Sequence, residues 1–436
     1  MRLIDEQTLQ ALEGSRPADT VTAWAWRAGA LVVPEPLQII DWSAQDAAGD
    51  SVNVGQQLTF TVADPDGTLG AWRLDDPLGV AGTELRVIYN VGGAGSVNYG
   101  KFRVTGNEPY EVTTSYVVDE YGYIEPDGDL PPHKRRKYVT KAYVKLDVVD
   151  LTARANQDKL EAPQSPADGA TAISEFRRLT QRHFPVVVDP GVVDAPVSTL
   201  LVFDKGERMN HCQDLASRLG ARYRMGGDGE CHIYPRNSDP VWTIEPGKSL
   251  VKVTRRQSSD GLYNRWVVEG KDAGNEGAPI RGAASITSGP LRYDGPHGRV
   301  QFFYSSEMIT NQADADNYAQ KLRDEFLQSL AVELSIETIP WPQGQAGDRV
   351  VVGCPVAAGH VAYFTGEVTD IRRGGNPVPD GTSLKVQCSL AEVIEGLSRT
   401  DWAQHLTGEI PELTWDRMPG TWGSLPDMLW NTIGRS

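Results

Sequence analysis

Apolar and polar residues alternate in several stretches of the first third of the chain, a period of two that is typical of strands with one buried face. Leu58, Phe60 and Val62 alternate with threonines, and the turn sequence Asp64-Pro65-Asp66-Gly67 follows them. The pattern therefore predicts an antiparallel barrel or sandwich over residues 37–155. Further strands of this barrel are predicted over residues 83–91, 100–105 and 138–148.

Two segments of this first region lack the alternation. Residues 1–36 mix tryptophans and prolines with polar residues, and we expect an N-terminal arm or an edge strand there. Residues 116–137 hold tyrosines, acidic residues and Pro131-Pro132, which is the composition of an exposed connection. An extended loop between two strands is therefore predicted over residues 116–137.

The chain from residue 156 to residue 240 changes to helical spacing. Apolar residues recur every three or four positions between Asp168 and Phe184, and a second short helix begins near Asn210 and ends at Gly220. Two short strands joined by Gly226-Gly227-Asp228-Gly229 then predict a hairpin. Together these elements predict a small α+β domain between two strand-rich regions.

Strand patterns return over residues 241–400, and one helix interrupts them. The helix is predicted over residues 312–329, with Ala315, Leu322 and Phe326 on its buried stripe. It leads directly into an alternating segment that starts at Leu330. Later strands are predicted over residues 349–353, 364–371 and 384–390. The predicted fold class is thus mainly β with an α+β insertion: two antiparallel β-barrel domains and a small α+β domain.

The last segment, residues 401–436, is a tail rich in tryptophan and proline. Trp415 and Trp422 begin two copies of a W-x-x-Φ-P pattern, and Trp430 follows. Prolines at this spacing prevent one continuous helix. We therefore expect an extended segment whose tryptophans anchor it to another surface, on this chain or on a neighbour.

Composition and charge argue against several classes of protein, including nucleic-acid-binding, membrane-anchored and disulfide-rich proteins. Among 436 residues, 44 glycines and 28 prolines favour a turn-rich, strand-rich protein. A formal net charge of −16 argues against sustained binding to nucleic acid or to an acidic membrane face. No apolar run approaches the ~20 residues that cross a bilayer, and the start of the chain lacks a signal-peptide pattern. We expect synthesis in the cytoplasm and no membrane anchor, and four cysteines are too few for a disulfide scaffold.

No pattern predicts a catalytic, cofactor or metal site. His211-Cys212 and Cys231-His232 could offer zinc ligands, but neighbouring residues on a helix or strand diverge, so we expect buried cysteines and incidental histidines. Carboxylates such as Asp119, Glu120, Glu125 and Asp127 predict solvated loops, and neither a G-x-S-x-G motif nor a phosphate-binding loop occurs. The one dense basic run is predicted to be a solvated or partner-facing segment: Lys134, Arg135, Arg136 and Lys137.

Several segments, taken in order, carry a family resemblance: Gln56 through Asp64-Pro65-Asp66-Gly67 to Gly100-Lys101-Phe102-Arg103-Val104, then Leu215–Gly220 with Gly229–Pro235, Asn264–Val268, and Ala313–Leu322 leading to Gly347–Val352. These segments cover most of residues 37–400. They resemble the baseplate-hub, or tail-hub, minor tail proteins of long-tailed, siphovirus-type bacteriophages. The tryptophan- and proline-rich tail is similar to the tails of hubs from phages that infect actinobacteria.

The resemblance implies a structural, non-enzymatic protein of the virion tail tip. It implies a homotrimer whose two tube-like barrel domains per chain build a pseudo-hexameric ring below the distal tail protein. Such a ring continues the tail-tube channel, holds the C-terminus of the tape-measure protein, carries minor tail and receptor-binding tip proteins, and gates the passage of DNA. Acidic residues facing the channel would keep DNA from sticking, and no fused lytic domain is expected because the chain ends soon after the second barrel.

Two alternatives stay open on the sequence. A host-surface glycan-binding module would use exposed aromatic residues such as Trp24, Trp26, Tyr121 and Tyr123 to stack on sugar rings. A cell-wall hydrolase would use a pair of the abundant carboxylates.

Overall fold

The computed structural model is mainly β and divides into two compact units. It describes residues 1–2, 4, 6–13, 19–49, 52–118, 124–125, 135–197, 201–206, 208–256, 261–271, 279–289, 291–305, 311–329, 331–357, 360–376 and 381–398. The first unit comprises Met1–Val253, Ser335–Pro355 and Glu367–Val386. The second comprises Thr254–Leu334, Val356–Gly366 and the described residues from Gln387 onward.

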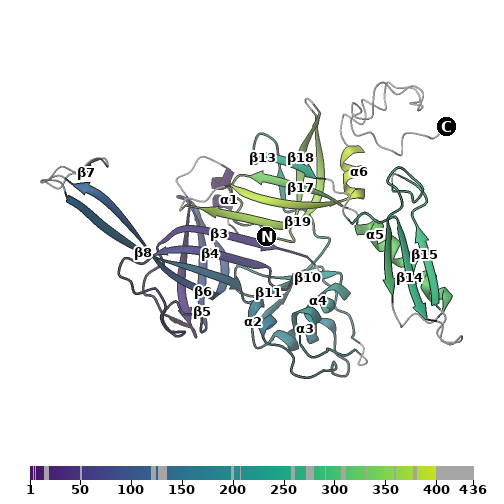
Figure 1. Ribbon diagram of the computed structural model, residues 1–436, viewed down its shortest axis with the longest axis horizontal. Helices are drawn as coiled ribbons and strands as arrows, with labels where there is room; N and C mark the ends of the chain where they lie inside the picture. The colour runs from purple at the N-terminus through teal and green to yellow at the C-terminus, as the bar shows by residue number, and fades with distance from the viewer. Residues whose placement is uncertain are drawn as a thin grey trace. The chain divides into compact units, whose positions relative to one another are not determined.

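One 14-stranded sheet dominates the first unit (Figure 1). Its main path runs β13-β17-β20-β19-β3-β4-β8-β6-β5-β1-β2. Outside this path, β7 pairs with β6, β18 pairs with β19, and β12 pairs with β18. The pairings from β19 through β3 to β2 are antiparallel. The strands are β1 (Thr20–Arg27), β2 (Ala30–Leu31), β3 (Ile39–Ala47), β4 (Gln56–Ala63), β5 (Thr83–Val91), β6 (Gly95–Val118), β7 (Ile124–Glu125), β8 (Arg135–Asp150), β12 (Trp242–Ile244), β13 (Leu250–Arg256), β17 (Ala331–Thr338), β18 (Arg349–Ala357), β19 (His360–Gly375) and β20 (Thr382–Ser389).

The prediction of two separate barrels is wrong in its connectivity. Among the described strands no set of pairings closes a barrel; instead, strands from both predicted barrels join in one sheet. The junction is the β3–β19 pair, which runs from Asp370 opposite Ala47 to Gly375 opposite Trp42. Alternation along one strand defines its buried face but does not identify its neighbour, so this pairing is invisible in the local pattern.

The predicted alternation of buried residues is confirmed in the first half of the sheet. Leu58, Phe60 and Val62 are at most 2% exposed and pack with residues of the neighbouring strands. The N-terminal segment contains helix α1 (Glu6–Glu13) and strand β1, which pairs with β5 along its whole length. This core positions β6 and β8, the two longest strands of the first half.

The loop predicted over residues 116–137 is shorter than expected. β6 continues to Val118 and pairs with β8 as far as Arg135, so both ends of the expected loop belong to a long hairpin. Figure 1 shows this hairpin extending beyond the rest of the sheet. The sequence predicted that this strand begins at Tyr138, because the charged residues before Tyr138 show no alternation of apolar and polar positions.

The predicted α+β segment is also part of the first unit and has its own core. A parallel β9–β11 pair and an antiparallel β10–β11 hairpin form a three-stranded sheet. Helix α3 begins with a capping box between Thr171 and Ser174 and ends at Thr180, before His183. The elements are α2 (Thr152–Gln157), α3 (Ala172–Thr180), β9 (Val186–Val188), α4 (Arg208–Arg218), β10 (Ala221–Met225) and β11 (Cys231–Pro235).

The second unit holds a three-stranded sheet and the helix predicted from the apolar stripe. Helix α5 (Gln312–Ser329) has Ala315 and Ala319 fully buried in one cluster with Val268 of the sheet. A Cβ at Gly282 would overlap the backbone of Ala315, so glycine permits this close approach. The other elements are β14 (Arg265–Lys271), β15 (Pro279–Ser285), β16 (Gln301–Ser305) and α6 (Leu390–Ser398). No helix in the described part of the chain has the length and apolar character of a membrane span.

Candidate functional site

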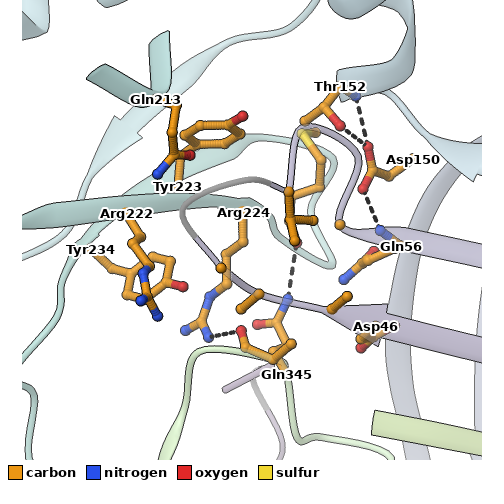
Figure 2. Close-up of a pocket in the computed structure, with 17 residues that line it drawn as sticks. Asp46, Gln56, Asp150, Thr152, Gln213, Arg222, Tyr223, Arg224, Tyr234 and Gln345 are labelled. Atoms are coloured by element: carbon orange, nitrogen blue, oxygen red, sulfur yellow. Dashed lines mark hydrogen bonds between the residues drawn. The ribbon is translucent and has the colours of Figure 1, made fainter. Parts of the chain in front are cut away.

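A small cavity with a mixed polar and apolar lining lies where the α+β segment meets the large sheet (Figure 2). Its lining includes Asp46 of β3, Asp150 of β8 and Arg224 of β10. The space open to the centre of a water molecule is about 20 Å³, which is enough for one ordered water. A pocket for a small-molecule substrate is typically ~300 Å³ or more, so this cavity is not a substrate site.

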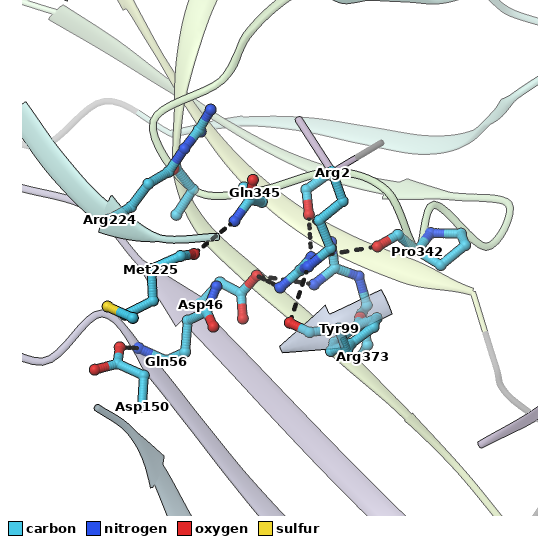
Figure 3. Close-up of polar contacts among 12 residues, drawn as sticks. Arg2, Asp46, Gln56, Tyr99, Asp150, Arg224, Met225, Pro342, Gln345 and Arg373 are labelled. Atoms are coloured by element: carbon cyan, nitrogen blue, oxygen red, sulfur yellow. Dashed lines mark hydrogen bonds and ion pairs between the residues drawn. The ribbon is translucent and has the colours of Figure 1, made fainter. Parts of the chain in front are cut away.

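The cavity wall is held by specific hydrogen bonds. Asp150 accepts from the backbone N–H of Gln56 at 2.7 Å and of Thr152 at 2.8 Å. Burial raises the pKa of Asp150 to about 6, although these donors favour the carboxylate. Gln345 donates to the Met225 carbonyl at 2.9 Å (Figure 3). The Asp150 contacts fix the end of β8 to the start of β4, and the Gln345 contact fixes the end of β10 to the segment before β18.

The half-buried side chain of Arg224, which also lines the cavity, forms a second polar group with Asp348. Its guanidinium donates to Asp348 Oδ1 at 2.7 Å and lies 4.3 Å above the ring of Tyr234. Burial raises the pKa of Asp348, but the charge of Arg224 and the Met1 amine outweigh it, so the pKa is lowered overall. The Arg224–Asp348 pair thus ties the α+β hairpin to the segment that precedes β18.

Two buried arginines share one carboxylate at the β3–β19 junction (Figure 3). Arg2 and Arg373 each donate to Asp46 Oδ2 at 3.2 Å, and all three side chains are at most 3% exposed. The ring of Tyr99 lies 4.1 Å from the Arg2 guanidinium carbon and 5.5 Å from that of Arg373. The remaining donors bind backbone carbonyls of Tyr99, Trp341, Pro342 and Gly344. The cluster therefore holds five chain segments together: the N-terminus, β3, β6, residues 341–344 and β19.

His232 lies between two carboxylates, a contact that the sequence did not predict. Its Nδ1 is 2.8 Å from Asp189 Oδ1, and its Nε2 is 3.0 Å from Asp228 Oδ2. Burial lowers the pKa of His232, but the hydrogen bonds and charges of both carboxylates outweigh that effect and raise it. The expectation that this histidine is incidental is therefore wrong. Because His232 follows buried Cys231 on a strand, its side chain is expected on the opposite face of that strand. No local sequence pattern indicates that Asp189 is its partner.

The expected burial of the other zinc candidates is confirmed. Cys212 and Cys231 are fully buried in the core of the α+β segment, and burial raises the pKa of Cys212 to about 12. His211 forms a hydrogen bond through Nε2 to the backbone carbonyl of Asp204, at 3.0 Å. Within the described ranges no group of three or more His, Cys, Asp or Glu residues could hold a metal ion.

The predicted partner-binding residues fall mostly outside the described residues: Trp415, Trp422, Trp430 and Lys134. The backbone of Arg135, Arg136 and Lys137 lies in β8, opposite Val118, Val117 and Tyr116 of β6. The basic run therefore belongs to the distal part of the hairpin, and its binding role stays a prediction. Of the aromatic residues considered for glycan stacking, Trp24 and Trp26 are half-buried in β1, and Tyr121 and Tyr123 lie outside the described residues.

The hairpin stem itself is an exposed surface with aromatic side chains. The rings of Tyr110 and Tyr143 lie 5.4 Å apart across the two strands, and Tyr110 and Val112 are each about 40% exposed. A hydroxyl pair, Thr113 and Thr140, follows at 3.0 Å. An isolated two-stranded ribbon is marginally stable in water. Such a ribbon is typical of an element that another surface covers in an assembly.

Comparisons with known proteins identify the fold. No protein-family model matches the chain, and a search of curated proteins finds no match either. A tail protein from Neisseria meningitidis MC58 has a similar structure, with a TM-score of 0.53 and 11% identity over 84% of this chain and 96% of that one. The 43 kDa tail protein of prophage MuSo2 from Shewanella oneidensis gives a TM-score of 0.54 and 11% identity over 85% of this chain and 98% of that one. The chain therefore shares the fold of these two tail proteins.

Proposed function

We propose that this protein is a structural component of a bacteriophage tail, related in role to the baseplate hub, and that it acts by assembly and not by catalysis. The observation that carries the proposal is the fold, which matches two tail proteins over 96% and 98% of their own lengths.

The finer proposal is a homotrimeric ring at the tail tip. Among the described strands the main path of the sheet ends at β2 and β13, and the proposal assigns these two borders to pairing between copies. Pairing between copies removes such borders, and a head-to-tail arrangement closes them into a ring. The ring would continue the tail-tube channel, contact the distal tail and tape-measure proteins, carry tip proteins, and gate the passage of DNA. A net charge of −16 per chain supports a channel that repels DNA.

Two measurements test the proposal. The molar mass of the purified full chain, measured by analytical ultracentrifugation over a concentration series, should reach that of a trimer. Electron microscopy of virions labelled with an antibody against the protein should place it at the tail tip, in a threefold ring. A monomer at every concentration, combined with label on side fibres or on the capsid, would contradict the assignment.

A further inference from the structure

A loop between β4 and β5, residues 64–82, presents two apolar side chains to solvent. Trp72 is 94% exposed and Leu74 is 70% exposed, and Arg73 stands between them. Trp72 has the greatest exposure among the large apolar side chains of the described residues. Tryptophan and arginine are the residue types that most often dominate the energetics of protein interfaces. We call residues 72–74 the knob.

The backbone that carries the knob is fixed by buried and half-buried acceptors. The Asp64 carboxylate, 3% exposed, accepts from the N–H groups of Thr68, Leu69 and Gly70 at 2.9–3.1 Å. The Asp76 carboxylate accepts from the N–H groups of Trp72 and Arg73, both at 2.8 Å. The exposed position of Trp72 is therefore built into the loop.

Two further contacts anchor the loop to the sheet. Asn107 accepts from the Ala71 N–H at 3.1 Å and donates to the Leu78 carbonyl at 3.0 Å, and the Leu78 side chain is fully buried. The Arg27 guanidinium donates to the carbonyls of Asp75 and Asp76. A loop held in this way loses little conformational entropy when it binds, which favours affinity.

A groove lined by both apolar and charged residues lies on the α+β segment of the same unit. It is an open depression of about 560 Å³ between residues 201–204 and helix α4. Leu201, Val202 and Leu215 supply apolar surface to its wall, and Val202 is 49% exposed. Its rim carries two carboxylates and one guanidinium, which form no ion pair with any described residue: Asp204, Asp214 and Arg218. We call this the α4 groove.

We propose that the knob of one copy inserts into the α4 groove of a second copy. Arg73 and Asp75 form an exposed ion pair with each other at 2.6 Å, a pair that contributes little stability in water. In the contact this pair would exchange partners, Arg73 with Asp204 and Asp214, and Asp75 with Arg218. The knob and the groove are different surfaces of one chain, so the contact is head-to-tail and repeats from copy to copy around a ring. This inference rests on the proposed self-assembly and names the contact that drives it.

Disulfide trapping between full-length chains tests the contact. The native cysteines are buried, so they do not compete with cysteines introduced at the surface. A Trp72→Cys chain and a Val202→Cys chain are mixed and mildly oxidised, and linked peptides are identified by mass spectrometry. Since each chain carries one new cysteine, a link between positions 72 and 202 is intermolecular. The matched control replaces Val202→Cys with Val193→Cys, a 79% exposed site in the same segment that does not line the groove.

The proposal predicts a 72–202 link at least about tenfold more abundant than the 72–193 link, and equal yields overturn it. The double variant Trp72→Ser, Leu74→Ser should raise the midpoint concentration of self-assembly by at least about tenfold, whereas Val193→Ser should not. If the wild type assembles and the double variant assembles equally well, the knob contact is wrong while the proposed function stands. If the wild type is a monomer at every concentration and is absent from tail tips, both fail.

Discussion

Arg373 donates from Nη1 to Oδ2 of Asp46 at 3.2 Å, although 327 residues separate the two in sequence. Asp46 is on β3 and Arg373 is on β19, so this bond crosses the junction between the two halves of the large sheet. Because Arg2 binds the same oxygen, two buried guanidinium groups depend on one carboxylate for their charge compensation.

Replacing that carboxylate should therefore be strongly destabilising. Asp46→Asn leaves both arginines without a counter-ion in the interior, and we expect a loss of about 3–5 kcal/mol in the free energy of unfolding. Urea unfolding at pH 7 measures it. The control is Asp41→Asn, an exposed position on the same strand, which should change stability by less than about 0.5 kcal/mol. A similarly small effect at Asp46 would contradict the role given to the junction.

Asp150 should make stability depend on pH. Its pKa is about 6 in the folded protein against 3.8 when exposed, so between these values the folded state binds more protons than the unfolded state. The wild type should therefore gain up to about 3 kcal/mol relative to Asp150→Asn as the pH falls from 7 to 4. Urea unfolding of both proteins at several pH values measures the difference. A difference that stays constant would show that this carboxyl does not titrate in a buried site.

His232 predicts a pH dependence of the same sign in a higher pH range, because its pKa is also raised in the folded protein. Its folded pKa is raised above 6.5, so the stability it contributes is present below pH 6.5 and is lost as the pH rises through the folded pKa. The advantage of wild type over His232→Gln should shrink between pH 6 and pH 8.5. Because the variant keeps Asp150, its contribution cancels in this comparison. An advantage that grows with pH would rule out the proposed pairing with Asp189 and Asp228.

Gly227 should not tolerate a side chain. It lies in the β10–β11 turn, and a Cβ there would overlap the carbonyl oxygen of Asn98 on β6. We expect Gly227→Ala to cost about 1–3 kcal/mol by forcing the hairpin away from the strand. Gly49→Ala is the control, since its Cβ would meet Val52 at an ordinary 3.5 Å. Equal thermal stability of the two variants would refute the close approach.

Local patterns predicted the elements well. The alternation at Leu58, Phe60 and Val62 depends on neighbours in sequence, and these residues are buried as expected. Of the helical stripe, Ala315 is buried, whereas Leu322 and Phe326 are half-buried. The junction could not be predicted, because no pattern links β3 to β19 and an arginine at position 2 is ordinarily expected in solvent. The Asp189–His232 contact could not be predicted either, because no local pattern links these two positions. The exposure of Trp72 follows from the loop bonds of Asp64 and Asp76, which the turn sequence alone does not specify.

The pairing of β3 with β19 also constrains how the chain folds during synthesis. When the ribosome has made the first half of the protein, β3 has β4 on one side and no partner on the other, and Asp46 still lacks Arg373. An unpaired strand border of this kind promotes aggregation of nascent chains. The free border of β3 therefore stays exposed until residues 370–375 have emerged from the ribosome.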